Sequence, residues 1–155
     1  MTNITRRPQV PCFEAYNGNA GDYAVSANTK ITCFVSTSRN QGNHYNTSNQ
    51  RWTCPTTGVW LFYAHFRMGA PGSVRVFRAE FTVNGSGTND LCTCGGNNNY
   101  DNGGGYDHPA ATGTLIRHLT AGDYVELYTS TELDSTNTLY IQTGQRSHWG
   151  CIFVG

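Results

Sequence analysis

The segment GVWLFYAHF at residues 58–66 decides the fold, because it predicts a β-strand that is apolar on both faces. Successive side chains of a strand point to opposite sides, so Trp60, Phe62 and Phe66 share one face. The opposite face is nearly as apolar and carries Val59, Leu61, Tyr63 and His65. We therefore expect this strand to be covered on two sides.

Working outward, most of the chain predicts strands. Ten segments carry strand-forming residues: 12–16, 30–35, 43–46, 51–54, 58–68, 73–84, 113–119, 123–130, 138–143 and 148–155. Turn residues such as Asn84-Gly85 separate them. Ala, Leu, Glu and Lys, which long helices prefer, are scarce. The sequence predicts an all-β fold, a two-sheet antiparallel jelly-roll sandwich of about ten strands.

The strands differ in how many faces are apolar. Residues 73–84 alternate normally, with Phe77, Ala79, Phe81 and Val83 opposite Val76, Arg78, Glu80 and Thr82. In residues 148–155, by contrast, Trp149, Cys151 and Phe153 oppose two further apolar side chains, Ile152 and Val154. Residues 123–130 show a milder form, in which Val125 and Leu127 oppose Tyr124, Glu126 and Tyr128.

Strands with two apolar faces imply a second cover, because a two-layer sandwich buries only the inner face of each sheet. The sequence predicts no helix that could cover this second face, so we expect another copy of the same protein to cover it. The predicted subunit interface comprises Val59, Leu61, Tyr63, His65, Tyr124, Tyr128, Ile152 and Val154. The predicted core comprises Trp60, Phe62, Phe66, Phe77, Phe81, Leu115, Val125, Leu127 and Trp149. The alternative is that the tyrosines and His65 are single exposed side chains.

These residues belong to four segments that resemble, in order, the C1q-like globular domain, a jelly-roll relative of the tumour necrosis factor (TNF) fold. They are NHYNTSNQRWTCPTTGVWLFYAHF (43–66), FTVNG (81–85), GTLIRHLTAGDYVELYT (113–129) and SHWGCIFVG (147–155). The resemblance implies a ten-stranded jelly roll that assembles as a tight homotrimer and acts by binding. The sequence differs from that pattern in lacking a collagen-like Gly-X-Y stalk and in carrying a central insertion.

The insertion at residues 86–110 is rich in Gly and Asn and predicts a long surface loop. Long loops on a rigid sandwich often carry recognition. The candidate recognition residues are Tyr100, Asp101, Tyr106 and Asp107, with a cell-surface glycan or protein as ligand. Two alternatives remain: an inert structural loop, or carboxylates that bind Ca²⁺. Apart from this Ca²⁺ alternative, the sequence predicts no cofactor.

Composition and motifs exclude several functions. Ten basic and ten acidic residues cancel, which gives no electrostatic footprint for nucleic acid. No apolar run reaches the ~20 residues that span a bilayer, so no membrane insertion is expected. The histidines are dispersed and no G-x-S-x-G motif occurs, so we expect no enzyme.

Six cysteines lie in the chain, and they include no C-x-x-C pair, so no metal site is expected. Cys12, Cys33, Cys54 and Cys151 fall in predicted strands, either as buried thiols or in disulfides. Cys92 and Cys94 lie in the loop as a candidate disulfide or as two free thiols.

The expected organisation is an extended arm at residues 1–11 followed by one jelly-roll domain at 12–155. The chain starts with Met and shows no signal segment, which favours a virion surface component made in the host cytoplasm. This would be a trimeric capsid decoration (cement) protein or fibre knob of a virus or bacteriophage. Arg6 and Arg7 in the arm would dock on capsid or tail proteins. The alternative is a secreted, extracellular recognition module whose signal peptide is missing from this sequence.

Overall fold

The computed structural model describes residues 10–69, 74–85, 110–129, 134–135 and 139–155. Within these ranges the chain forms β-strands and one short 3₁₀ helix, η1 (Gln41–Asn43). The strands are β1 (Cys12–Asn17), β2 (Tyr23–Ala24), β3 (Ser36–Asn40), β4 (Tyr45–Asn46), β5 (Arg51–Thr53), β6 (Gly58–Gly69), β7 (Val74–Val76), β8 (Ala79–Val83), β9 (Ala110–Leu119), β10 (Tyr124–Thr129), β11 (Asp134–Ser135), β12 (Tyr140–Ile141) and β13 (Gly144–Phe153).

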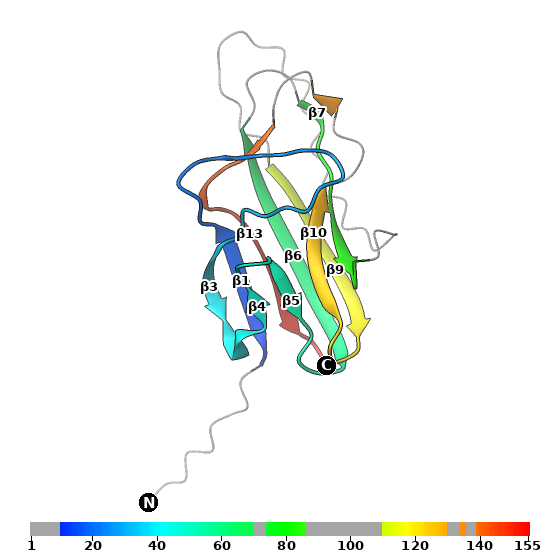
Figure 1. The fold of residues 1–155 in the computed structure, drawn as a ribbon. Coiled ribbons are helices and arrows are strands. Elements are labelled where there is room, and N and C mark those ends of the chain that lie inside the picture. The colour runs from blue at the N-terminus through cyan, green and yellow to red at the C-terminus, as the bar shows by residue number, and fades with distance from the viewer. Residues whose placement is uncertain (1–9, 70–73, 86–109, 130–133, 136–138) are drawn as a thin grey trace, which may run out of the picture.

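Two large antiparallel sheets and one two-stranded sheet make up the described part of the domain (Figure 1). The larger sheet has the strand order β2-β12-β6-β13-β1-β3, and β9 pairs with the other edge of β6. The smaller sheet has the order β4-β5-β10-β8, and β7 pairs with β11. Among the described residues, no helix has the length and apolar character that crossing a membrane requires. The predicted all-β jelly roll is confirmed.

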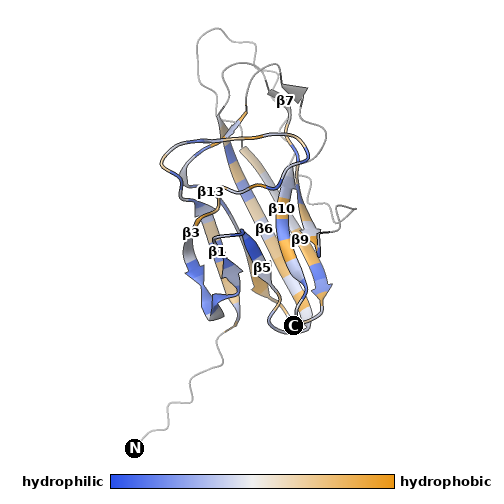
Figure 2. Cartoon of the chain, in the orientation of Figure 1, coloured by the Kyte–Doolittle hydropathy of each residue, from blue (hydrophilic) through white to orange (hydrophobic). Residues whose placement is uncertain are grey.

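The core lies between the two sheets. Buried and half-buried residues alternate along the whole of β6, and Figure 2 shows hydrophobic and hydrophilic bands alternating along the central strands. Trp60 and Phe62 of β6 pack edge-on against Trp52 of β5, with ring centroids 4.7 and 5.3 Å apart. Eight predicted core residues are buried: Trp60, Phe62, Phe66, Phe77, Phe81, Val125, Leu127 and Trp149. Leu115 is half-buried against this cluster.

The prediction of a strand at residues 30–35 is wrong. Lys30 makes only an isolated bridge to Tyr128 of the smaller sheet, whereas Ser36 begins β3 of the larger sheet. The segment between them therefore crosses from one sheet to the other. Cys33 and Phe34 are adjacent in the sequence and both fully buried. In a strand with one solvent-exposed face, two adjacent side chains would point to opposite faces, and one of them would be exposed.

Residues 73–84 form two strands, β7 and β8, where one was predicted, and Phe77 and Arg78 lie between them. The predicted face is wrong at one position, since Thr82 is buried, whereas Val83 is half-buried against the core, on the side predicted for it. The register explains the burial of Thr82. It lies opposite Glu126 of β10, whose own side chain is covered by charged neighbours described below.

Candidate functional site

The outward face of the larger sheet is the candidate site, and β6 lies near its centre. Leu61 and His65 of β6 face the same side as their partners in the two neighbouring strands. Leu61 pairs with Ile152 of β13 and Ile116 of β9, and His65 pairs with His148 and Thr112. On this open face, Val59, Leu61, Tyr63 and His65 are all half-buried within one chain.

Exposed apolar residues gather on this face. Among the described residues, the exposed large hydrophobic side chains are Val10, Ile116, Ile152 and Val154, with exposed fractions of 54%, 67%, 42% and 60%. Ile116 and Ile152 flank Leu61. Val10 and Val154 lie just beyond the paired residues Cys12 and Ile152, at the same end of the sheet. The apolar surface is therefore one patch at one end of the open face.

A polar network occupies the middle of the open face. The Tyr63 hydroxyl donates to Glu14 Oε2 at 2.9 Å, and the Ser38 hydroxyl donates to Glu14 Oε1. The hydrogen bond from Ser38 is the main cause that lowers the pKa of Glu14, although partial burial opposes it. Burial raises the pKa of Tyr63, and Glu14 raises it further. This face thus holds a carboxylate that accepts a hydrogen bond from a neutral phenol.

Gly150 makes that network sterically possible. It lies on β13 between Tyr63 of β6 and Glu14 of β1, with which it pairs on either side. A Cβ atom at this position would lie 2.3 Å from the Phe13 carbonyl oxygen and 2.7 Å from the Tyr63 hydroxyl. The Tyr63 phenol therefore reaches Glu14 by crossing over β13 at a residue that has no side chain.

Next to this network, two histidine rings stack across the β6–β13 pair. The centroids of His65 and His148 are 5.4 Å apart, and the rings are inclined by 27°. Both line an open hollow of about 550 Å³ with Tyr63, Ala64, Thr112, Gly113 and Thr114. Burial, followed by the charge of His148, lowers the pKa of His65, so the neutral imidazole is favoured there.

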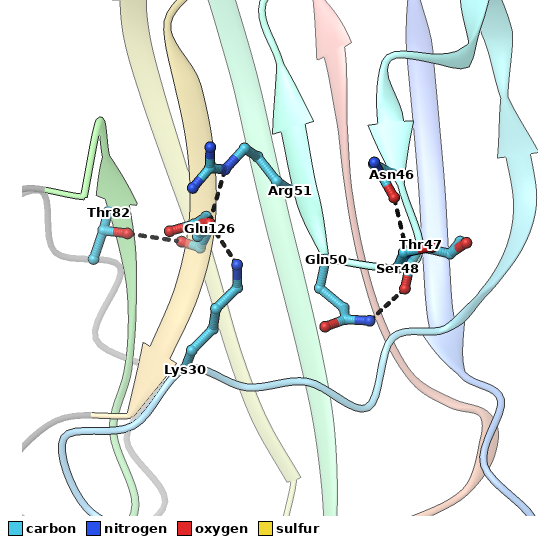
Figure 3. A network of polar contacts seen from close by, with 8 residues as sticks. All are labelled: Lys30, Asn46, Thr47, Ser48, Gln50, Arg51, Thr82 and Glu126. Carbon is cyan, nitrogen blue, oxygen red and sulfur yellow. Dashed lines mark hydrogen bonds and ion pairs between the residues drawn. The ribbon is translucent and has the colours of Figure 1, made fainter.

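Tyr124 and Tyr128 do not lie on the open face. They belong to β10 of the smaller sheet, and Glu126 between them is only 2% exposed. Lys30 Nζ and Arg51 Nε contact Glu126 Oε1 at 2.5 and 2.9 Å (Figure 3), and the Arg51 guanidinium lies 3.7 Å from the centre of the Tyr124 ring. The predicted interface residues therefore divide between two sheets, and only those on the larger sheet form one surface.

The cysteines within the described ranges are free thiols: Cys12, Cys33, Cys54 and Cys151. Burial raises the pKa values of Cys33, Cys54 and Cys151, so these thiols resist ionisation. In that part of the chain, no three His, Cys, Asp or Glu side chains gather closely enough to hold a metal ion. Several predicted residues lie outside the described ranges: Arg6, Arg7, Cys92, Cys94, Tyr100, Asp101, Tyr106 and Asp107.

Solved structures with a similar architecture match this chain over nearly its whole length. The Eiger TNF structure from S. frugiperda has a TM-score of 0.72, covering 96% of this chain and 94% of that chain at 10% identity. The chain has the jelly-roll fold of TNF and C1q globular domains. The globular domain of zebrafish complement 1qA has a TM-score of 0.65, covering 95% and 98% at 12% identity. Murine APRIL at pH 5.0 gives 0.66, covering 94% and 100% at 14% identity. The sequence itself matches no family model and no curated protein.

Within this TNF/C1q fold, sequence reasoning missed several residues of the open face, among them Glu14, Ile116 and His148. A signal existed for Ile116, because strand alternation places it opposite in direction to Leu115, which was assigned to the core. Glu14 and His148 gave no signal of their own. They meet Tyr63 and His65 only through the register of β1, β13 and β6, which residue order along the chain does not encode.

Proposed function

We propose that this chain is a non-enzymatic binding module that assembles as a homotrimer through the open face of its larger sheet. The observation that carries the proposal is the single patch around Leu61, Ile116 and Ile152, which gathers the exposed large hydrophobic residues of the described chain. A patch of this kind usually marks a protein–protein contact. Trimer assembly is typical of domains with the TNF/C1q fold, which favours three copies over two.

The smaller sheet lacks the character of an interface. Its outward face holds Glu126 with Lys30 and Arg51, so its buried charge is already paired within one chain. Covering this face with another subunit would also dehydrate the partly exposed cations, which is costly. We therefore assign self-association to the larger sheet and leave Tyr124 and Tyr128 facing outward. The proposed interface residues are Val59, Leu61, Tyr63, His65, Ile116, Ile152 and Val154.

The mass of the particle in solution tests the trimer. Light scattering on the purified chain should give about 51 kDa, three times the 17.0 kDa chain mass. Leu61→Asp should place a charge between subunits and return the mass to one chain. Thr53→Asp is the matched control, because it adds the same charge on an exposed position of the smaller sheet. A wild-type mass of one chain, or a trimer that Leu61→Asp leaves intact, would refute the proposal.

For the setting of the trimer, we propose display on a virion surface as a capsid decoration protein or fibre knob. The proposed organisation is an arm at residues 1–11, with Arg6 and Arg7, followed by the domain at 12–155. The position of the two chain ends supports this proposal. At the end of the sheet where β1 begins, Cys12 pairs with Ile152, and the Phe153 N–H donates to the Pro11 carbonyl at 3.2 Å. The first described residues and the C-terminus therefore lie at one end of the sandwich, and we propose that the opposite end faces the ligand.

Deletion of residues 2–11 separates docking from assembly. The shortened chain should stay trimeric but should no longer attach to capsid or tail proteins, because the deletion removes Val10 from the open face but leaves Leu61, Ile116 and Ile152 in place. Attachment that survives the deletion would contradict the docking role of the arm.

A secreted, extracellular recognition module is the second candidate, and the similarity to the complement 1qA globular domain over 95% of this chain favours it. In either setting we propose the insertion at 86–110 as the recognition loop, with Tyr100, Asp101, Tyr106 and Asp107 as contact residues. A glycan array should lose its signal in the Tyr100→Ala, Tyr106→Ala variant. Binding that needs Ca²⁺ would assign Asp101 and Asp107 to the cation instead, and binding that neither change affects would place recognition elsewhere.

A further inference from the structure

We infer that His65 and His148 together bind one divalent transition-metal ion, Zn²⁺, in the hollow of the open face. The two residues are far apart in the sequence but directly opposite each other on β6 and β13. The two ligands belong to a single chain, so the inference does not require the proposed trimer, although His65 is also one of the proposed interface residues.

The geometry of the pair suits one shared ion. The ring centroids are 5.4 Å apart, the rings are inclined by 27°, and both residues line the same hollow. Zn²⁺ binds imidazole nitrogen at about 2.0–2.1 Å. An ion bound to one nitrogen of each ring therefore fits between two rings whose centroids are 5.4 Å apart. Imidazole is also a preferred ligand of this class of metal.

The hydrogen bonds of the rings leave nitrogen lone pairs for a metal. His148 Nδ1 lies 3.1 Å from the Gln145 carbonyl oxygen. Because a carbonyl only accepts, Nδ1 carries the proton and Nε2 is the atom with the free lone pair. A backbone carbonyl that orients a histidine in this way is common behind metal ligands. Among the described residues, the His65 ring has a stacking partner but no hydrogen-bond partner.

The rest of the hollow leaves room for the other positions of a tetrahedral ion. Its further polar side chains are the hydroxyl groups of Tyr63, Thr112 and Thr114. Glu14 lies nearby, but Tyr63 and Ser38 donate to its two oxygens. Two imidazoles therefore fill two positions, and water that the threonine hydroxyls can hold fills the others.

Calorimetric titration of the full chain with ZnCl₂ tests this site. Every sample carries Cys92→Ser and Cys94→Ser, because two thiols one residue apart would also bind zinc. The otherwise wild-type chain should bind one Zn²⁺. His65→Gln and His148→Gln should each weaken binding by about tenfold or more, since each removes a direct ligand. His118→Gln is the control, because it removes an exposed imidazole from the same face, opposite Val59 and away from the pair.

The outcomes separate this inference from the trimer. No Zn²⁺ binding by the chain, or equal binding after His65→Gln and His148→Gln, would overturn the metal site even if light scattering shows a trimer. A monomer that loses Zn²⁺ binding in both variants would support the site and refute the trimer. Near-ultraviolet circular dichroism checks folding, and if His65→Gln unfolds the chain, the comparison of His148→Gln with His118→Gln decides.

Discussion

Ile116→Asp should dissociate the trimer without unfolding the protomer. Ile116 exposes 67% of its surface in the single chain, so its side chain contributes little to the core. Burying a whole isoleucine side chain stabilises by about 1.5–3 kcal/mol, and burying the exposed two-thirds between subunits is worth about 1–2 kcal/mol. Three subunits lose that amount each, about 3–6 kcal/mol in total, which lowers the association constant by roughly two to four powers of ten.

The introduced carboxylate adds to this loss, because an unpaired charge between subunits costs several kcal/mol more. Sedimentation velocity over a dilution series should therefore show one-chain particles at concentrations where the wild type is trimeric. Thr53→Asp should behave as the wild type. Thermal unfolding followed by near-ultraviolet circular dichroism should show that Ile116→Asp keeps its tertiary structure. A variant that stays trimeric, or one that is unfolded at all concentrations, would refute the assignment of Ile116 to the interface.

Three further predictions concern the protomer. Trp60→Ala should lower the free energy of unfolding by about 3–5 kcal/mol in urea titrations, because it empties a fully buried site; a loss near zero would contradict its place in the core. Gly150→Ala should cost about 1–3 kcal/mol, since its Cβ would collide with Phe13 and Tyr63, and equal thermal midpoints would contradict this. Glu14 has a pKa below its ordinary 4.5 in the fold, so its stabilising effect is present above about pH 4.5 and is lost on acidification. The difference in thermal midpoint between wild type and Glu14→Gln should shrink as the pH falls, and a constant difference would argue against the hydrogen bonds to Glu14.

Strand alternation was sufficient to predict the inner faces of the sheets. The two-residue period placed Trp60, Phe62 and Phe66 together, and the structure buries all three. The same rule fails where the chain leaves a sheet, as at Cys33 and Phe34, because the backbone between the sheets does not alternate there and both neighbours are buried. It also fails to detect strands of two residues such as β2 and β11, which are too short to show a period.

Apolar composition is less informative about the outward faces, because it does not show what already covers a residue. Tyr124 and Tyr128 have the same alternation as the residues of 58–66, and on that ground they were assigned to the interface. Their strand instead carries Glu126, which draws Lys30 and Arg51 over the face from distant parts of the chain. Such contacts depend on strand order and register, which single-sequence patterns do not contain.

The two outward faces therefore have different physical requirements. On the smaller sheet, each charge near Glu126 has a partner in the same chain, so water and the paired side chains complete the surface. On the larger sheet, Ile116 and Ile152 remain exposed beside Leu61, and no charged group of the described chain lies across them in the strand register. Their transfer out of water is favourable only if another molecule covers them. Self-association would satisfy this requirement with the residues at hand, which is why we propose the open face of the larger sheet, and not the more aromatic face of the smaller one, as the subunit interface.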